Sequence, residues 1–184
     1  DDLITCVSGG KALEEIRTLT VRTPAEFVPE MRALCAQAGV ALALVAGMSG
    51  TPWYGAVEWL TKDKVMILLS LRGRREDRFW FSFYHEAGHV LLHRRKPLFL
   101  DDDSAEGERE EEANKFAEDF LIPPAQRQRV KRLRSRAQVR ALAEELGIAP
   151  GIVVGRYQHL TGKWDWFNDM RREVTWSGSE SRAG

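Results

Sequence analysis

The chain reads Phe79-Trp80-Phe81-Ser82-Phe83-Tyr84-His85-Glu86-Ala87-Gly88-His89-Val90-Leu91-Leu92 near its middle. Apolar side chains recur there at intervals of three and four residues, which predicts a helix with one apolar stripe buried in a core. His85 and His89 are four residues apart and therefore share one helical face. With Glu86 between them they form the order H-E-x-x-H, in which the histidines can bind zinc and the glutamate can act as general base.

A helix that carries two histidines by accident is the alternative explanation, and it would need no third ligand. A zinc site needs at least one more protein ligand, and catalysis needs a position left for water or substrate. Candidates lie downstream, between Glu110 and Pro123. This segment predicts a second amphipathic helix, which ends at the Pro123-Pro124 pair.

A helical wheel of this second segment distinguishes three consecutive glutamates. Its apolar face consists of Ala113, Phe116, Ala117, Phe120 and Leu121. Glu110 lies nearest to that face, Glu112 lies at the opposite flank, and Glu111 points away. Acidic residues in a first turn also complement the helix dipole, but this does not explain a carboxylate on the apolar side. We therefore expect Glu110 to be the third ligand.

The two motifs together resemble a known family. They read His85-Glu86-x-x-His89-x-x-Leu92-His93 and Glu110-x-Glu112-Ala113-Asn114-x-Phe116-Ala117-x-x-Phe120-Leu121-Ile122-Pro123. The chain resembles the ImmA/IrrE family of zinc metallopeptidases from about Leu19 to Phe167, in particular members fused behind an Xre-type helix-turn-helix domain in HigA-like antitoxin regulators. The resemblance implies that Glu110 is a ligand, in agreement with the wheel. It also implies cleavage of a helix-turn-helix transcriptional repressor in stress, toxin-antitoxin or phage-related regulation.

The expected chemistry is zinc-dependent hydrolysis of a peptide bond. His85, His89 and Glu110 would hold the ion, which would lower the pKa of a bound water. Glu86 would accept the proton of that water as it attacks the carbonyl, and would then pass the proton to the leaving amine.

Three further side chains invite a role at this site. Tyr157 and His159 are candidates for stabilising the oxyanion of the tetrahedral intermediate, and packing with a solvated polar tip is the alternative for both. His93 lies one turn beyond His89, but it is eight residues from His85, or about 12 Å of helix rise. We therefore expect His93 to support the site or to pack, and not to bind the same ion.

The capping, turn and strand signals in the rest of the sequence predict an α+β core around these helices. A capping box predicts a helix over 23–38, and an apolar run predicts a buried strand over 40–46. Segments 54–60 and 65–71 predict a hairpin, and 98–100 a further edge strand. The expected fold class is α+β: a small antiparallel or mixed sheet packed on the H-E-x-x-H helix and the second ligand helix, followed by a helical C-terminal subdomain.

The last third of the chain predicts two short helices, from a capping box at Ser135 to Gly147 and onward from Pro150. The pair is similar to a helix-turn-helix unit. Its second helix begins Gly151-Ile152-Val153-Val154-Gly155, which offers few polar side chains to base edges. We therefore expect a structural or substrate-docking role. The core of this part is expected to be sealed by Trp164, Trp166 and Phe167.

These patterns predict four segments: an N-terminal lead over 1–18, a metallopeptidase core over 19–131, a helix-turn-helix-like subdomain over 132–176 and a disordered tail over 177–184. The chain begins at Asp1 without methionine. By the resemblance, the lead could be a linker from an upstream DNA-binding domain.

Composition limits the partners. Lysine plus arginine number 27, as do aspartate plus glutamate, so no net charge attracts nucleic acid or an anionic membrane. The acidic run 101–112 and the basic run 127–140 are interpreted as solvated surface. Cys6 and Cys35 make no disulfide framework, and no apolar run is long enough to span a membrane. We expect a cytoplasmic protein with a protein substrate, without membrane or direct nucleic-acid binding; the oligomeric state stays open.

Two other functions remain open at this point. One is a non-catalytic antitoxin-type regulator whose peptidase-like domain binds metal or a partner. The other is a DNA-binding module built on residues 135–160, which would bind duplex in a salt-sensitive way. The intact Glu86 favours the enzyme, because a degenerate domain has no chemical need for it.

Overall fold

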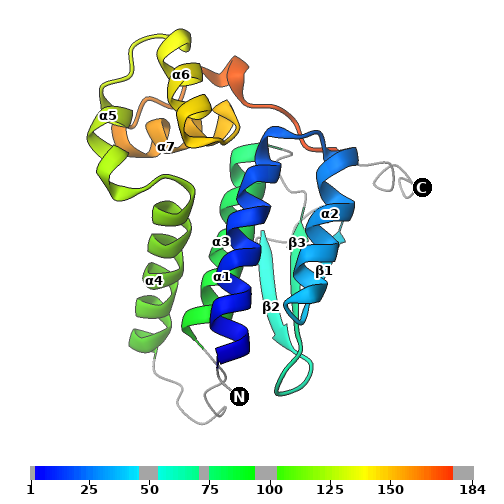
Figure 1. Cartoon of the computed structure of the whole chain (residues 1–184). Coiled ribbons are helices and arrows are strands. Elements are labelled where there is room, and N and C mark those ends of the chain that lie inside the picture. The colour runs from blue at the N-terminus through cyan, green and yellow to red at the C-terminus, as the bar shows by residue number, and fades with distance from the viewer. Residues whose placement is uncertain (1–2, 46–53, 71–74, 94–102, 176–184) are drawn as a thin grey trace, which may run out of the picture.

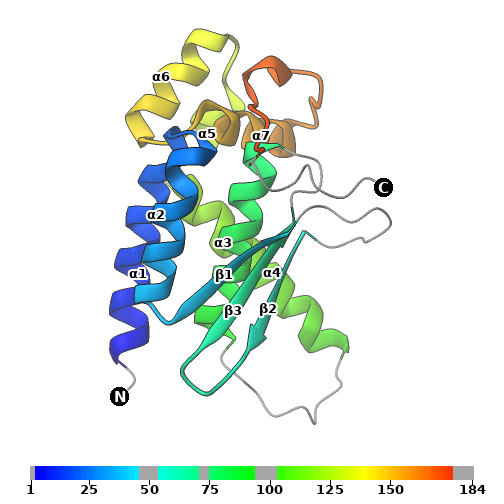
Figure 2. The ribbon, with the colours of Figure 1, turned by 90° about the vertical axis from the view of Figure 1, so that its right-hand side faces the viewer.

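The computed structural model of the 184-residue chain describes residues 3–45, 54–70, 75–93 and 103–175. A three-stranded mixed sheet lies beside a layer of long helices, and shorter helices gather at one end of that layer (Figure 1; Figure 2). The α+β class predicted from the sequence is confirmed.

The N-terminal segment belongs to this layer. Residues Leu3–Thr18 form helix α1, and a 3₁₀ turn at Leu19–Val21 follows. Leu13 and Ile16 are buried, and the backbone carbonyl of Leu13 accepts a hydrogen bond of 2.8 Å from the Tyr84 hydroxyl. The segment predicted as an N-terminal lead over 1–18 thus contains a helix that contacts the core. Glycines in the middle of this segment weaken its helical signal, and contact with the core compensates for them.

Helix α2 (Pro24–Gln37) begins and ends as predicted. The Glu26 carboxylate accepts a hydrogen bond of 2.9 Å from the backbone N–H of Thr23, which completes a capping box. Gly39 has a φ of +76°, in the left-handed region that glycine tolerates, and strand β1 starts directly after it. The apolar face of α2 buries Phe27, Met31 and Cys35.

The sheet has the order β1-β3-β2, with β1 at Val40–Val45, β2 at Gly55–Trp59 and β3 at Val65–Ser70. Strand β2 pairs antiparallel with β3, so the predicted hairpin is confirmed. Strand β1 pairs parallel with β3, which makes the sheet mixed. Among the described strands, β2 therefore lies at an edge. The strand predicted over 98–100 lies outside the described residues, as does the tail over 177–184.

Two long helices lie side by side in the layer: α3 (Glu76–Leu92), and α4 (Asp103–Leu121) at the outer edge of the layer (Figure 1). Helix α3 buries Phe79, Trp80, Phe83, Tyr84, Ala87 and Val90. A Cβ on Gly88 would lie 3.2 Å from the Cα of Ala113, so the glycine permits the close approach of the two helices. Helix α4 begins earlier than the prediction, which started at Glu110.

The C-terminal helices are α5 (Arg127–Lys131), α6 (Arg136–Leu146) and α7 (Pro150–Thr161), with 3₁₀ turns at Pro124–Gln126 and Asn168–Met170. Helix α7 packs against the start of α3, where a Cβ on Gly155 would lie 2.7 Å from Oδ2 of Asp77. The buried positions of α7 are Gly151, Ile152, Val153, Val154, Gly155, Tyr157 and Gln158. A helix that buries this much of its surface cannot enter a DNA groove with the same residues.

Ion pairs hold the segment around Arg171 and Arg172 against the start of α3. Arg172 contacts Glu76 at 2.7 Å, and Arg171 contacts Asp77 at 2.9 Å. Several side chains of the basic run 127–140 also have acidic partners, including Arg127 with Asp119, Arg129 with Glu145 and Arg136 with Asp169. These pairs agree with the interpretation of that run as solvated surface.

A membrane-spanning helix must be both long and predominantly apolar. Within the described ranges, none of the helices combines the length and the apolar composition that a membrane span requires.

Candidate metal centre

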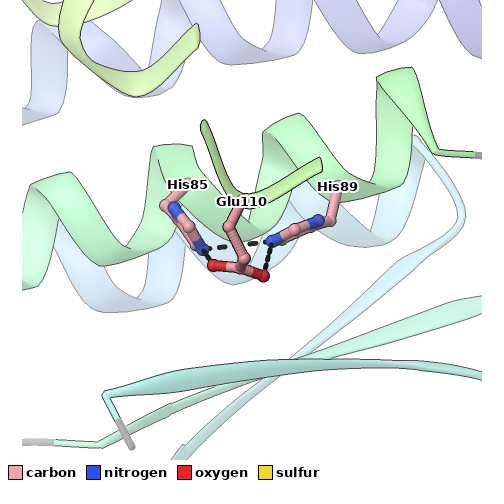
Figure 3. Close-up of side chains that lie close together, drawn as sticks. All are labelled: His85, His89 and Glu110. Carbon is pink, nitrogen blue, oxygen red and sulfur yellow. Dashed lines mark hydrogen bonds and ion pairs between the residues drawn. The ribbon is translucent and has the colours of Figure 1, made fainter. Parts of the chain in front are cut away.

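Helix α3 presents His85 and His89 on one face, and helix α4 places Glu110 opposite them (Figure 3). The Nε2 atoms of the two histidines are 3.1 Å apart. One carboxylate oxygen of Glu110 lies 3.2 Å from Nε2 of His85, and the other lies 3.0 Å from Nε2 of His89. The structure thus brings together the three residues that the sequence selected as ligands.

The donor set fits a zinc ion in chemistry and in spacing. Zinc is bound by imidazole nitrogen and carboxylate oxygen at about 2.0–2.2 Å, so tetrahedral ligand atoms lie roughly 3.4 Å from one another. The three distances among His85, His89 and Glu110 are close to that value. Two ring nitrogens and a carboxylate that converge in this way provide lone pairs for a cation.

Each histidine also uses its second ring nitrogen. Nδ1 of His85 lies 2.9 Å from Oδ1 of Asn114, and Nδ1 of His89 lies 3.0 Å from Nδ1 of His93. His93 in turn places its Nε2 2.9 Å from Oε2 of Glu112. His93 therefore lies outside the three-residue cluster and supports one of its members, as its distance from His85 along the helix suggested.

Burial differs among the members of the cluster. The side chains of His85 and His89 are 15% and 19% exposed, whereas that of Glu110 is 51% exposed. Burial lowers the pKa of His89, and the neighbouring His85 lowers it further. His89 is thereby kept in the neutral form that binds metal.

Glu86 lies beside the cluster, at the interface between α3 and the sheet. It is buried, and burial together with the negative charge of Glu110 raises the pKa of its carboxyl to about 7. A carboxyl with a pKa near neutrality can both accept and release a proton at physiological pH. The residue thus has the environment that a general acid and base needs.

A cleft of about 550 Å³ opens next to His85 and Glu86. It lies between α3, α4 and α7, and Tyr54 and Gly55 of the β2 region complete its lining. Its apolar lining consists mainly of Phe81, Leu121, Ile122, Ile152, Gly155 and Trp164. The cleft can therefore accept a large apolar group close to the cluster.

Trp164 corrects one prediction. It was expected to help seal the C-terminal core with Trp166 and Phe167, but it is 55% exposed and lines the cleft. Trp166 is also 38% exposed, and only Phe167 is buried. The three aromatics lie within one turn, so their side chains do not all face inward.

The two oxyanion candidates are placed differently. His159 lines the cleft, with its ring edge-on to Trp164 at a centroid distance of 5.0 Å. Tyr157 is fully buried, packs against Trp166 and Phe167, and is not among the lining residues. Its hydroxyl cannot reach a substrate in the cleft without rearrangement of this packing, so the geometry argues against Tyr157 as a catalytic residue.

Sequence reasoning missed three residues that shape the site. Asn114 was quoted within the second motif without a role, although it lies one turn beyond Glu110. Glu112 was placed on a flank without its contact to His93. Gly55 was treated only as part of a strand, yet a Cβ there would collide with Glu86. The first two carried a helical-spacing signal, whereas the third carried none.

Comparison with known proteins agrees with this geometry. No curated protein matches the chain significantly. The family model described as the IrrE N-terminal-like domain, a peptidase family designated M78, matches residues 48–157. That range includes both motifs, the cluster, Glu86 and the first two turns of α7, and it is more than half of the chain. The chain therefore belongs to the family of IrrE N-terminal-like metallopeptidase domains.

Proposed function

We propose that this domain is a zinc-dependent metalloendopeptidase. The observation that carries the proposal is the position of Glu86: a buried carboxyl with a pKa of about 7 lies beside the cluster of His85, His89 and Glu110 and lines the same cleft as His85. A site that only stored metal would have no use for a proton acceptor at this place. The family assignment supports the same activity.

Each residue of the site has a proposed role in the hydrolysis. His85, His89 and Glu110 would bind zinc, which supplies Lewis-acid chemistry that activates water and polarises a carbonyl group. The Glu86 carboxylate would take a proton from the attacking water and deliver it to the nitrogen of the leaving amine. His159 is the candidate donor to the developing oxyanion, because it lines the cleft.

The cleft supports a protein substrate with a large apolar side chain near the scissile bond. Its apolar lining provides that environment, and three of its charged wall residues, Arg156, Glu118 and Asp77, already have partners of opposite charge. Arg156 donates to Glu118 at 2.7 Å, and Arg171 binds Asp77 at 2.9 Å. By its resemblance to ImmA/IrrE peptidases, the proposed substrate is a helix-turn-helix transcriptional repressor in the cytoplasm.

Two substitutions test the proposal. Glu86→Gln keeps the size of the side chain but cannot accept the proton, so it should retain zinc and lose cleavage of a co-expressed candidate repressor. Glu110→Ala should lose zinc itself, as measured by elemental analysis, while Glu111→Ala, on an exposed neighbouring position, serves as its control. Wild-type cleavage by Glu86→Gln would contradict the mechanism. Stoichiometric zinc without cleavage of any candidate would favour the non-catalytic regulator.

A further inference from the structure

We propose that His93 and Glu112 form a hydrogen-bond relay that orients the imidazole of His89 for metal binding. This inference rests on the proposed function of the site. His93 lies at the C-terminal end of α3, one turn after His89, and Glu112 lies on α4, two residues after Glu110. Both are positioning residues, since they act through His89.

The direction of each hydrogen bond in the relay follows from Glu112, the last residue in the series His89, His93, Glu112. The Glu112 carboxylate can only accept, so Nε2 of His93 donates to it across 2.9 Å. A neutral imidazole carries one N–H, so Nδ1 of His93 accepts the N–H of Nδ1 of His89 across 3.0 Å. Nε2 of His89 then presents a lone pair toward Glu110, which is the form that binds a metal.

Asn114 does the same for the other histidine in one step. Its side-chain oxygen lies 2.9 Å from Nδ1 of His85 and accepts the N–H there. Helix α4 therefore supplies three groups: Glu110 of the cluster, Asn114, which contacts His85 directly, and Glu112, which contacts His89 through His93. His93 is needed as an intermediate because Glu112 contacts His93 and not His89.

The exposure of the two side chains predicts that His93 and Glu112 contribute unequally to metal affinity. The side chain of His93 is 11% exposed, whereas that of Glu112 is 64% exposed. Water competes little for a hydrogen bond between His89 and His93, and it competes strongly at Glu112. Removal of the His93 ring nitrogens should therefore weaken metal binding more than removal of the Glu112 carboxylate.

A purely structural role for His93 makes a different prediction. Its backbone N–H donates to the carbonyl of His89 at 3.0 Å, which helps to end α3 whatever the side chain is. Under that role, phenylalanine should serve as well as histidine, because it keeps the ring and the backbone. Under the relay, glutamine should restore function, because its amide can both accept from His89 and donate to Glu112.

The experiment compares metal binding by the wild-type chain and by four variants. Zinc dissociation constants are measured by competition with a chromogenic chelator, and visible absorption spectra are recorded with cobalt in place of zinc. His93→Phe should bind zinc about 10–100-fold more weakly and shift the cobalt bands. Glu112→Ala should show a smaller loss, and His93→Gln should recover most of the affinity. Glu111→Ala, which removes an exposed carboxylate from the same turn, should match the wild type.

Wild-type affinity and an unshifted cobalt spectrum in His93→Phe would overturn the relay. An equal loss in Glu111→Ala and Glu112→Ala would also overturn it, because charge alone would then explain the effect. Should His93→Phe fail to fold, Glu112→Ala decides the question, since its side chain is largely exposed. If the wild-type chain bound neither zinc nor cobalt, both the proposed function and the relay would be wrong. If the wild type and all variants bound metal equally well, only the relay would be wrong.

Discussion

A Cβ at Gly55 would lie 2.5 Å from Oε1 of Glu86 and 2.7 Å from its Cγ. The first residue of the edge strand β2 is thus in contact with the side chain proposed as general base. Any side chain at this position would have to displace Glu86, because both Gly55 and Glu86 belong to packed elements. The glycine therefore permits β2 to lie directly against the side chain of Glu86.

Gly55→Ala should abolish most of the cleavage and leave zinc binding intact. Displacement of Glu86 by about 1 Å would misalign the proton acceptor, and misplacements of that size cost roughly 10²-fold in rate. The three proposed ligands are unchanged in this variant, so zinc binding should be unaffected. Cleavage of a candidate repressor and zinc content, measured on the same preparation, test this expectation. Gly107→Ala is a suitable control, because a Cβ there meets nothing within 4 Å.

Trp164→Ala should weaken the cleavage of a protein substrate without unfolding the domain. The side chain is 55% exposed and lines the cleft, so the loss concerns substrate contact more than the core. A decrease of about tenfold in kcat/KM is expected for one lost apolar contact, with a stability change within roughly 0.5 kcal/mol. Trp166→Ala provides the comparison, because Trp166 is not among the lining residues. Equal kinetics for the two variants would argue against the cleft as the substrate site.

Glu76 should make the domain less stable as pH rises above the ordinary carboxyl range. Burial raises the pKa of Glu76 above its usual 4.5, although Arg172 opposes the shift. The native state therefore holds the proton more tightly than the unfolded chain does, and the free energy of unfolding falls as pH rises from 4.5 through the raised pKa.

Glu76→Gln tests this dependence, since an amide does not ionise but its oxygen can still accept from the backbone N–H of Arg172, which lies 3.0 Å from Oε1 of Glu76. Urea unfolding at a series of pH values should show a smaller decline for the variant than for the wild type. Parallel curves would mean that Glu76 does not titrate differently in the folded state.

Cys35 should resist thiol reagents until the domain unfolds. It is 3% exposed, and burial raises the pKa of its thiol to about 12, so little reactive thiolate is present near neutral pH. In a Cys6→Ser background, a chromogenic disulfide reagent should react only after addition of guanidinium chloride. Rapid reaction under native conditions would show that α2 opens readily.

Much of the site could be predicted from the sequence because its signals are local. The spacing of His85 and His89 places both on one face of any helix, and the wheel of the second segment separates Glu110 from Glu111. The capping box at Thr23 and the hairpin around 61–64 are likewise written in a few neighbouring residues. Such patterns depend on the geometry of a single element.

Other features depended on how the elements pack. The burial of α1, the parallel pairing of β1 with β3 and the cleft beside α7 arise from contacts between segments far apart in the chain. The same packing buries Tyr157 away from the cleft and leaves Trp164 exposed.

The sequence by itself determined which side chains a helix turns toward a metal and which elements carry them. Only the tertiary structure decided that Gly55 contacts Glu86 and that Glu112 reaches His93. Helical periodicity sets direction around one axis, whereas the distance between two axes is the outcome of all the side chains packed between them.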